Sequence, residues 1–216
     1  MLDQDVPAAD SPAVSVPMLR GELVWLRAST KADYTDESGD INHPDTGPNL
    51  GLKWPIGPDD AAAFAQKVMA QQGKTMWAFT ICPLGEQRGI GNVSLRDVDR
   101  ENGNAEMAIV IVDRAFQGRG YGTDAVNCIV DFGFGELRLE RIYLHVFDYN
   151  QRARRSYEKA GFQLEVTLRH ARFHHGSYHD VHVMAILRDE WLASDRPRAW
   201  DPRPAAGHAL TQPEGG

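Results

Sequence analysis

Residues 109–125 read IVIVDRAFQGRGYGTDA, and this segment carries the strongest fold signal in the sequence. An apolar, strand-like run comes first, a short polar segment follows, and Gly118, Gly120 and Gly122 lead into a helical pattern. Glycines let backbone N–H groups approach a ligand closely, because no Cβ atom is in the way. Such N–H groups at the start of a helix, with the helix dipole behind them, form an anion site that suits a pyrophosphate.

Two well-known phosphate-binding loops are excluded by the residues around these glycines. A Walker A loop needs Gly-Lys-Ser or Gly-Lys-Thr, and the segment has neither. The dinucleotide fingerprint is formally matched by Gly120-x-Gly122-x-x-Ala125, with Glu140 at a suitable distance downstream. In that fingerprint, however, the first glycine follows the strand directly, whereas residues 113–117 intervene here. Glu140 also precedes the next apolar run instead of ending it, so the loop is predicted to bind a different phosphate ligand.

Outward from this loop, the hydrophobic pattern changes repeatedly between strand and helix periodicity. Turn residues at 84–86 and 101–104 join strand-like runs in a way that suits an antiparallel meander. The pattern predicts strands at 23–27, 76–82, 89–96, 105–112, 142–147, 162–173 and 178–187, and helices at 31–40, 58–71, 120–134 and 151–160. A meander, then a strand–helix–strand–helix unit, then a hairpin predict an α+β fold of three layers around one central sheet.

The composition is that of an ordinary globular protein, with 42% hydrophobic and 25% charged residues in a chain of 216. The net charge of -7 argues against nucleic acid as a partner, because phosphate binding needs a basic face. It favours a cationic ligand instead. No apolar run approaches the ~20 residues that a bilayer demands, so no membrane partner is expected. Cys82 and Cys128 form neither a metal-ligand pattern nor a disulfide framework.

Both ends of the chain differ from its middle. Residues 1–17 and 194–216 are rich in proline and poor in hydrophobic residues, and both are expected to be disordered tails. The first tail is acidic and does not have the pattern of a signal peptide, so a cytoplasmic location is expected. Residues 18–193 are then expected to form one domain.

The arrangement Gln117-x-x-Gly120-x-Gly122 after an apolar strand resembles the acetyl-CoA motif of the GNAT superfamily of N-acetyltransferases. A second segment, residues 148–162 (DYNQRARRSYEKAGF), is similar to the next conserved stretch of that family. The opening run at 19–27 and the closing run at 176–191 are similar to the RimJ/RimL-type branch, which is ribosomal-protein-alanine N-acetyltransferase-like. The resemblance therefore covers nearly all of the predicted domain, in the expected order.

The resemblance implies a GNAT-like three-layer α/β/α fold. Its central sheet would be mixed, mostly antiparallel, and splayed between the fourth and fifth strands, here 105–112 and 142–147. It also implies acetyl-CoA as co-substrate and no metal. The residues that it places on the cofactor are Val110, Ile111, Val112, Gln117, Gly118, Arg119, Gly120, Tyr121, Gly122, Thr123 and Asn150.

Acetyl transfer needs a base for the amine and an acid for the departing thiolate. An alkylammonium group has a pKa near ~10.4, so it must lose a proton before it attacks. The resemblance places Glu106 where relatives carry an acid that faces the substrate cleft, and Tyr157 where many carry a phenol beside the sulfur. Ser156 is the alternative to Tyr157 on the same helix. Consecutive helix residues point about 100 degrees apart, so only one of the two is expected to face the cofactor, and we prefer Tyr157.

The histidines are interpreted as strand and hairpin residues. Five of them crowd the last hairpin, namely His170, His174, His175, His179 and His182. Polar hairpin positions near a substrate cleft explain them better than a metal site does, because no cysteine and only one acid accompanies them. His145 is interpreted as a satisfied strand histidine, with a place in the cleft as the alternative.

The identity of the amine is left open by the sequence. The branch resemblance favours a protein or peptide N-terminal α-amine. A small-molecule amine (polyamine, amino acid or antibiotic) is the alternative, and a larger acyl donor is possible. The segments at 33–54 and 174–179 are expected to select the acceptor. A non-catalytic acyl-CoA-binding regulator is the rival from another class, and a homodimer is expected only because it is common in the family.

Overall fold

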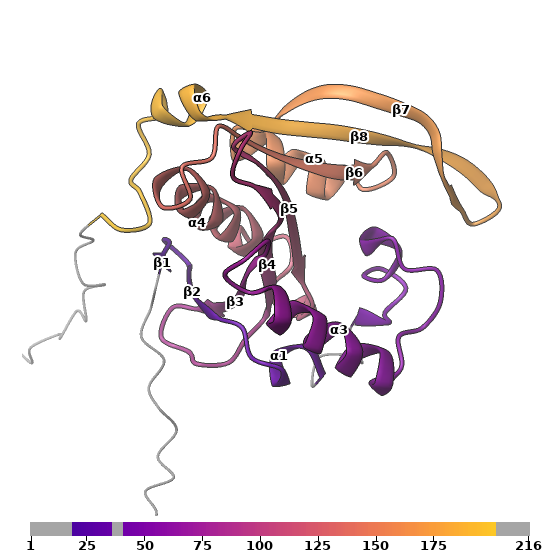
Figure 1. Cartoon of the computed structure of the whole chain (residues 1–216). Coiled ribbons are helices and arrows are strands. Elements are labelled where there is room, and N and C mark those ends of the chain that lie inside the picture. The colour runs from indigo at the N-terminus through magenta and orange to yellow at the C-terminus, as the bar shows by residue number, and fades with distance from the viewer. Residues whose placement is uncertain (1–18, 36–40, 202–216) are drawn as a thin grey trace, which may run out of the picture.

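The computed structural model describes residues 19–35 and 41–201. One mixed sheet of eight strands, in the order β1-β2-β3-β4-β5-β6-β8-β7, runs through the domain (Figure 1). The strands are β1 Leu19–Arg20, β2 Val24–Ala28, β3 Trp77–Pro83, β4 Gly91–Asp99, β5 Asn104–Ile111, β6 Arg141–Phe147, β7 Gln163–His174 and β8 Ser177–Leu187. The helices are α1 Ala32–Thr35, η1 Pro48–Leu50, α3 Pro58–Gln71, η2 Arg114–Phe116, α4 Tyr121–Gly135, α5 Gln151–Lys159 and α6 Arg188–Leu192.

The sheet opens at a single place that positions the site. All neighbouring strands pair antiparallel except β5 and β6, which run parallel. These two strands are paired only from Asn104 with Arg141 to Glu106 with Tyr143, and beyond that point they diverge. The predicted α+β class and the predicted splay between the strands at 105–112 and 142–147 are confirmed.

Helices cover both faces of the sheet (Figure 1). On β4, Val93 and Leu95 alternate toward the core under α4, whereas Ser94 and Arg96 face the α3 side. Gly133 lets α4 lie close to the sheet, since a Cβ atom there would stand 2.6 Å from Ile142 Cδ1. The alternation along the strands thus divides the domain into an apolar core on one face and a more polar face on the other.

Asp124 and Asp131 of α4 bind segments from the two ends of the described chain through hydrogen bonds. The carboxylate of Asp124 accepts hydrogen bonds from the backbone N–H groups of residues 22, 23 and 24. Asp131 is 1% exposed and accepts from Trp191 Nε1 at 2.7 Å, from the Arg196 guanidinium and from the Ala199 N–H.

The predicted C-terminal tail therefore begins too early. Residues 194–201 are packed onto α4, because Arg196 and Ala199 satisfy a buried carboxylate that composition alone does not reveal. The rest of that predicted tail, 202–216, and the predicted N-terminal tail, 1–17, lie outside the described residues. Part of the predicted helix at 31–40 also lies outside them, and α1 covers only Ala32–Thr35.

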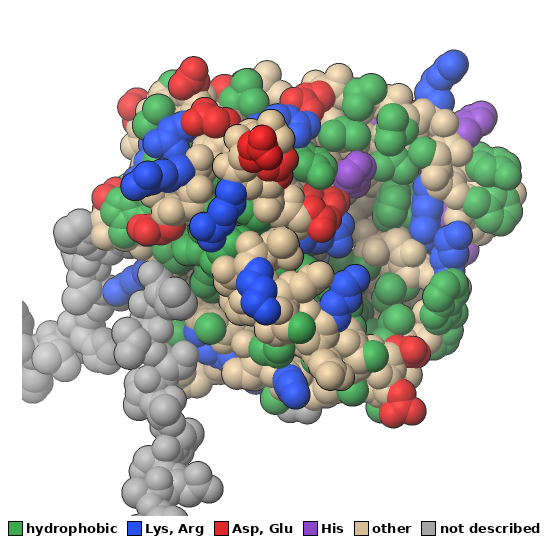
Figure 2. Space-filling model, in the orientation of Figure 1, with side chains coloured by type: hydrophobic (Ala, Val, Ile, Leu, Met, Phe, Trp, Pro, Cys, Tyr) green, Lys and Arg blue, Asp and Glu red, His purple; other side chains and the backbone are tan. Residues whose placement is uncertain are grey.

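The last two strands form a long hairpin at one end of the sheet. Its outer strand β7 carries the exposed apolar side chains Leu164, Val166 and Leu168, and Phe173 and Tyr178 are exposed near its tip. Figure 2 shows hydrophobic side chains gathered over this hairpin, while acidic and basic side chains are interspersed over the rest of the same face. None of the helices in the described part of the chain is long and apolar enough to cross a bilayer.

Candidate functional site

A cavity of about 360 Å³ lies where β5 parts from β6, between β5, α5 and the N-terminus of α4. Gly118, Gly120 and Gly122 line it. Gly118 and Gly120 have φ angles of 72° and 93°, in the left-handed region that glycine adopts without strain. No described backbone carbonyl accepts a hydrogen bond from the N–H groups of residues 118–120. Together with the first turn of α4, these donors have the arrangement that an anion site requires, and the anion site itself stays a prediction.

Gln117 connects the strand to the opposite helix. Its side-chain amide donates to the Ile111 carbonyl at 2.8 Å, and its side-chain oxygen accepts from Arg152 at 2.9 Å. Val110, Ile111 and Thr123 also line the cavity. This geometry fixes the loop across the open edge of β5.

Three residues predicted to contact the cofactor do not line this cavity. Val112 is buried and lines a second cavity on the α3 side of the sheet. The Arg119 guanidinium donates to the Ala115 carbonyl and lies over the Tyr121 ring, which packs edge-on against Phe116 at 5.0 Å. The side chains of Arg119 and Tyr121 thus stabilise the loop, and any contact with a ligand would come from their backbone.

The cavity is basic along α5. Arg152, Arg155 and Lys159 line it at a spacing of three and four residues, so they share one face of the helix. Arg154 is not among the lining residues and pairs with Glu158 at 3.0 Å. Three cations beside free N–H groups, in a chain with a net charge of -7, suit a polyanionic ligand.

Tyr157 and Asn150 also line this cavity. Asn150 caps α5, because its side-chain oxygen accepts from the Ala153 N–H at 3.2 Å. Burial raises the pKa of Tyr157 to about 12, and no hydrogen bond contributes to that shift. The phenol therefore stays protonated at neutral pH and is available as a donor. Ser156 faces the same cavity, where its hydroxyl accepts from Thr123 Oγ1 at 3.2 Å.

Glu106 lies on the other face of the sheet and is bound from two sides. Arg96 donates to both of its oxygens at 2.8 and 3.0 Å, and His145 Nδ1 lies 2.9 Å from Oε1. Burial alone would raise the pKa of Glu106, but the hydrogen bonds from Arg96 and His145 outweigh burial and lower it. Glu106 is therefore an ionised, engaged carboxylate, and its side chain is only 12% exposed.

The second cavity, of about 450 Å³, lies between the sheet and α3. Its walls are largely apolar and include Tyr34 and Phe64, whose rings meet edge-to-face at 5.6 Å. Ile109 and Val110 line this cavity and the first cavity alike, so the two spaces meet at these residues of β5.

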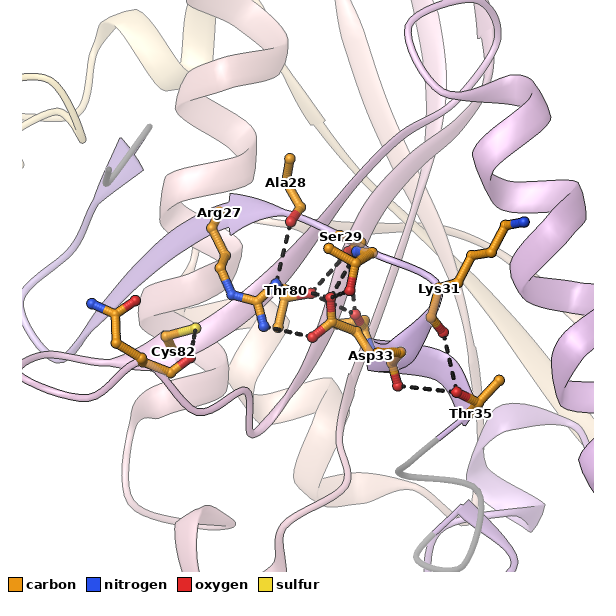
Figure 3. A network of polar contacts seen from close by, with 12 residues as sticks. Arg27, Ala28, Ser29, Lys31, Asp33, Thr35, Thr80 and Cys82 are labelled. Atoms are coloured by element: carbon orange, nitrogen blue, oxygen red, sulfur yellow. Dashed lines mark hydrogen bonds and ion pairs between the residues drawn. The ribbon is translucent and has the colours of Figure 1, made fainter. Parts of the chain in front are cut away.

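One carboxylate of the second cavity is already paired. Asp33 accepts from Arg27 at 2.8 Å and from the Thr30 N–H at 2.7 Å, in the network of Figure 3. Burial would raise the pKa of Asp33, but the hydrogen bonds from Arg27 and Thr30 lower it overall. Asp33 is thus a structural anion that holds the start of α1 beside the cavity.

Comparison with known proteins identifies the family. Residues 24–163 match the family model described as an acetyltransferase (GNAT) domain. The chain belongs to the GNAT acetyltransferase family. Among solved structures, it resembles a spermidine N-acetyltransferase from Vibrio cholerae in complex with CoA and spermine. The TM-score is 0.71 and the identity 27%, over 79% of this chain and 98% of that one.

Two curated relatives differ in the acceptor that their names give. The chain is 34% identical over 112 residues to a spermidine N(1)-acetyltransferase of Escherichia coli, which is 52% of this chain and 59% of the relative. It is 31% identical over 101 residues to a putative ribosomal N-acetyltransferase of Bacillus subtilis, which is 47% of this chain and 55% of the relative. The chain thus spans between half and two thirds of the length of these curated relatives.

In this GNAT domain, sequence reasoning missed several residues of the site. The α5 cations left a signal, since Arg152, Arg155 and Lys159 share one helical face in an acidic chain. The contact between Glu106 and His145 left none, because it joins two strands that are 39 residues apart in the sequence. In the described part of the chain, no three His, Cys, Asp or Glu residues lie close enough together to hold a metal ion.

Proposed function

We propose that this protein is an acetyl-CoA-dependent N-acetyltransferase that moves the acetyl group directly to a primary amine. The observation that carries the proposal is the meeting of the two cavities at Ile109 and Val110. One cavity has the donors and cations that a phosphorylated cofactor needs, and the other is a partly open, mostly apolar space for an acceptor. Transfer of the acetyl group directly from a cofactor in one cavity to an amine in the other needs no covalent intermediate on the protein.

The cofactor is proposed to enter from the α4 and α5 side. Its phosphates would bind the N–H groups of residues 118–123 and the cations of α5, as charge and geometry favour. The pantetheine arm would then follow the open edge of β5, whose N–H groups have no partner strand beyond the splay. This course leads the thioester toward Val110, where a backbone N–H is a suitable donor to the oxyanion.

Tyr157 is proposed as the donor to the departing sulfur. Tyr157 lines the same cavity as the glycine loop, and its raised pKa keeps the hydroxyl protonated in the neutral range. A thiol has a reference pKa near ~8.5, so the thiolate is stabilised by a hydrogen bond from the phenol and then gains a proton.

For the acceptor, we propose a small-molecule primary amine as the first class to test. The second cavity has the size of a small-molecule pocket, and the relatives from E. coli and V. cholerae are named for spermidine. A protein or peptide N-terminal α-amine is the second class. It is supported by the RimJ/RimL-like opening and closing runs and by the relative named as a putative ribosomal N-acetyltransferase.

The test is thiol release from acetyl-CoA in the presence of polyamines, amino acids, antibiotic amines and N-terminal peptides. Release with one class establishes the enzyme and its acceptor together. If acetyl-CoA binds tightly in calorimetry but no amine in the panel releases thiol, the proposal fails. The chain is then better described as an acyl-CoA-binding regulator.

A homodimer is proposed on the apolar outer strand of the hairpin. Leu164, Val166 and Leu168 are exposed on β7, an edge strand, and such a surface favours association. Sedimentation velocity should give a dimer for the full chain and a monomer for Val166→Lys. A monomer in both cases contradicts the proposed dimer and leaves the acetyltransferase proposal unaffected.

A further inference from the structure

Three side chains from three neighbouring strands form a polar chain on the face of the sheet that carries the second cavity. Arg96 of β4 holds both oxygens of Glu106 of β5, and Glu106 contacts His145 of β6. The Glu106 side chain is 12% exposed, whereas that of His145 is 40% exposed. The carboxylate is thus fixed from the protein side, and the imidazole at the end of the chain remains open.

The contact with Glu106 determines which nitrogen of His145 carries hydrogen. An ionised carboxylate only accepts hydrogen bonds, and the lowered pKa of Glu106 keeps it ionised at neutral pH. The hydrogen in the 2.9 Å contact must therefore be on Nδ1 of His145. In a neutral imidazole the lone pair is then on Nε2, so Nε2 is the basic atom.

His145 stands on the diverging strand and is joined through Glu106 to Arg96, which lines the second cavity. Pairing of β5 with β6 ends at Glu106 and Tyr143, and His145 lies two residues farther along β6. In the same direction along β5 come Ala108 and then Val110, where the two cavities meet. Ala108 pairs with Ser94, and both line the second cavity. Both side chains are small, and Ala108 stands between Glu106 and Val110, where the two cavities meet.

The charged groups on the His145 side of the sheet come from several elements of the described chain. On the strand opposite, β8 places Val183 directly across from it, and His182 faces the other side of the sheet with Val146. Farther along the same face, Arg141 pairs with Glu165 and lies over the Tyr143 ring. The other charged groups on this side of the sheet are Arg96 and Asp97 of β4, Glu106 of β5 and, around the second cavity, Asp33, Asp60 and Lys67.

We propose that His145 takes the proton from the acceptor amine and that Glu106, held by Arg96, is the residue that positions it. The inference rests on the proposed N-acetyltransferase function. The ammonium gives one proton to Nε2, and the freed nitrogen lone pair forms the N–C bond with the thioester carbon. The electron pair of the C–S bond leaves with sulfur, which ends as a thiol. The second amine proton is lost as the amide forms, and one proton is released to solvent overall.

An imidazole suits this step better than the carboxylate does. Reference pKa values are ~6.5 for imidazole, ~4.3 for a glutamate carboxyl and ~10.4 for an alkylammonium. Proton transfer to imidazole is therefore less unfavourable by about two pKa units, and a base closer to neutrality is the better catalyst at neutral pH. Glu106 also has both oxygens occupied by Arg96.

The experiment uses the full chain, acetyl-CoA and an amine that releases thiol with the wild type. His145→Gln should lower kcat about 100-fold, the range of a lost general base, and should remove the acidic limb of the kcat/KM profile. The Kd for acetyl-CoA, measured by calorimetry, should not change. Added imidazole should partly restore activity to His145→Ala. His182→Gln, on the opposite face, is the matched control and should keep the wild-type rate.

Glu106→Gln tests the positioning role with a second readout. The amide can donate to Nδ1 and so stabilise the wrong tautomer, and kcat should fall at least about tenfold, as when the carboxylate of a histidine–carboxylate pair is replaced. Nitrogen NMR of the imidazole should show hydrogen on Nδ1 in the wild type and a changed tautomer in the variant.

The inference is overturned if His145→Gln keeps the wild-type kcat and acidic limb, or if NMR shows hydrogen on Nε2 in the wild type. A wild type that releases thiol with no amine is a different failure. It contradicts the proposed function itself, and the proton-transfer role falls with it.

Discussion

The two sides of β5 offer different physical means of recognition to the cofactor and the acceptor that we propose for them. The cofactor side is built mainly from one continuous segment, β5 through the start of α4, with α5 packed beside it, and its donors are backbone N–H groups. The acceptor side is assembled from α1, α3, β4, β5 and the segment between α1 and α3, and its walls are side chains. A site built from backbone N–H groups requires glycines, which are visible in the sequence. A cavity walled by side chains from distant segments has no local sequence pattern.

Charge follows the same division. The cofactor side carries three lysine or arginine side chains on one face of α5. On the acceptor side, Asp33 and Glu106 are each held by an arginine, so neither is a free anion. The cofactor side thus carries cations on α5 that have no acidic partner among the described residues, whereas these two carboxylates of the acceptor side are paired with arginines.

Tyr157→Phe should lower kcat about 100-fold at saturating acetyl-CoA, because the thiolate loses its donor. The acetyl-CoA Kd should change little, since the ring remains. Because burial raises the pKa of Tyr157 to about 12, the phenol stays protonated well above neutrality. The wild-type rate should therefore show no decline from this group in moderately alkaline buffer. An unchanged kcat in Tyr157→Phe would exclude it as the donor, and Ser156→Ala would be the next variant to measure.

Gly120→Ala should weaken acetyl-CoA binding about tenfold. The φ angle of 93° strains any residue with a Cβ atom, at a cost of roughly 1–2 kcal/mol, and relief of that strain displaces the N–H donors. Gly73→Ala is the matched control, because Gly73 has a φ of 75° and does not line the first cavity. It should lose similar stability in urea unfolding and keep the acetyl-CoA Kd. Equal binding in both variants would contradict the anion-site assignment.

Arg155→Ala and Lys159→Ala should each weaken acetyl-CoA binding about fivefold at low salt, a typical effect for one partly exposed ion contact. The effect should shrink as salt is added. Arg154→Ala removes the same charge from the same helix but breaks only the pair with Glu158, so it serves as control. If all three variants bind equally well, the basic face of α5 does not contact the cofactor.

Phe64→Ala should raise the acceptor KM a few-fold and leave the acetyl-CoA Kd unchanged, because Phe64 lines only the second of the two cavities. Leu192→Ala removes an equally exposed apolar side chain on α6 and should change neither constant. A change in acetyl-CoA binding without a change in acceptor KM would reverse the assignment of the two sides.

The sequence predicted what is encoded locally. The glycine loop, the strand before it and the helix after it follow from adjacent residues, and the structure places Gly118, Gly120 and Gly122 on one cavity. The splay between the strands at 105–112 and 142–147, implied by the family resemblance, is confirmed. These features depend on backbone conformation and periodicity, which short segments determine.

The missed features depend on contacts between distant segments. Composition places Arg196 and Ala199 in a proline-rich tail, but both donate hydrogen bonds to the buried carboxylate of Asp131. The sequence favours a satisfied strand histidine at His145, with a place in the cleft as the alternative. It does not reveal the partner Glu106, because the two residues come together only when β5 and β6 lie side by side. The role of Glu106 as base remains a prediction, and its engagement by Arg96 is what shifts our proposal to His145.

Initial-velocity kinetics, with the concentrations of acetyl-CoA and of the active amine both varied, distinguish direct acetyl transfer from transfer through a covalent acetyl-enzyme. Direct transfer between two cavities that meet at Ile109 and Val110 requires both substrates to be bound together. The account therefore predicts intersecting lines in double-reciprocal plots, the pattern of a ternary complex. Parallel lines would indicate a covalent acetyl-enzyme and would contradict direct transfer across β5.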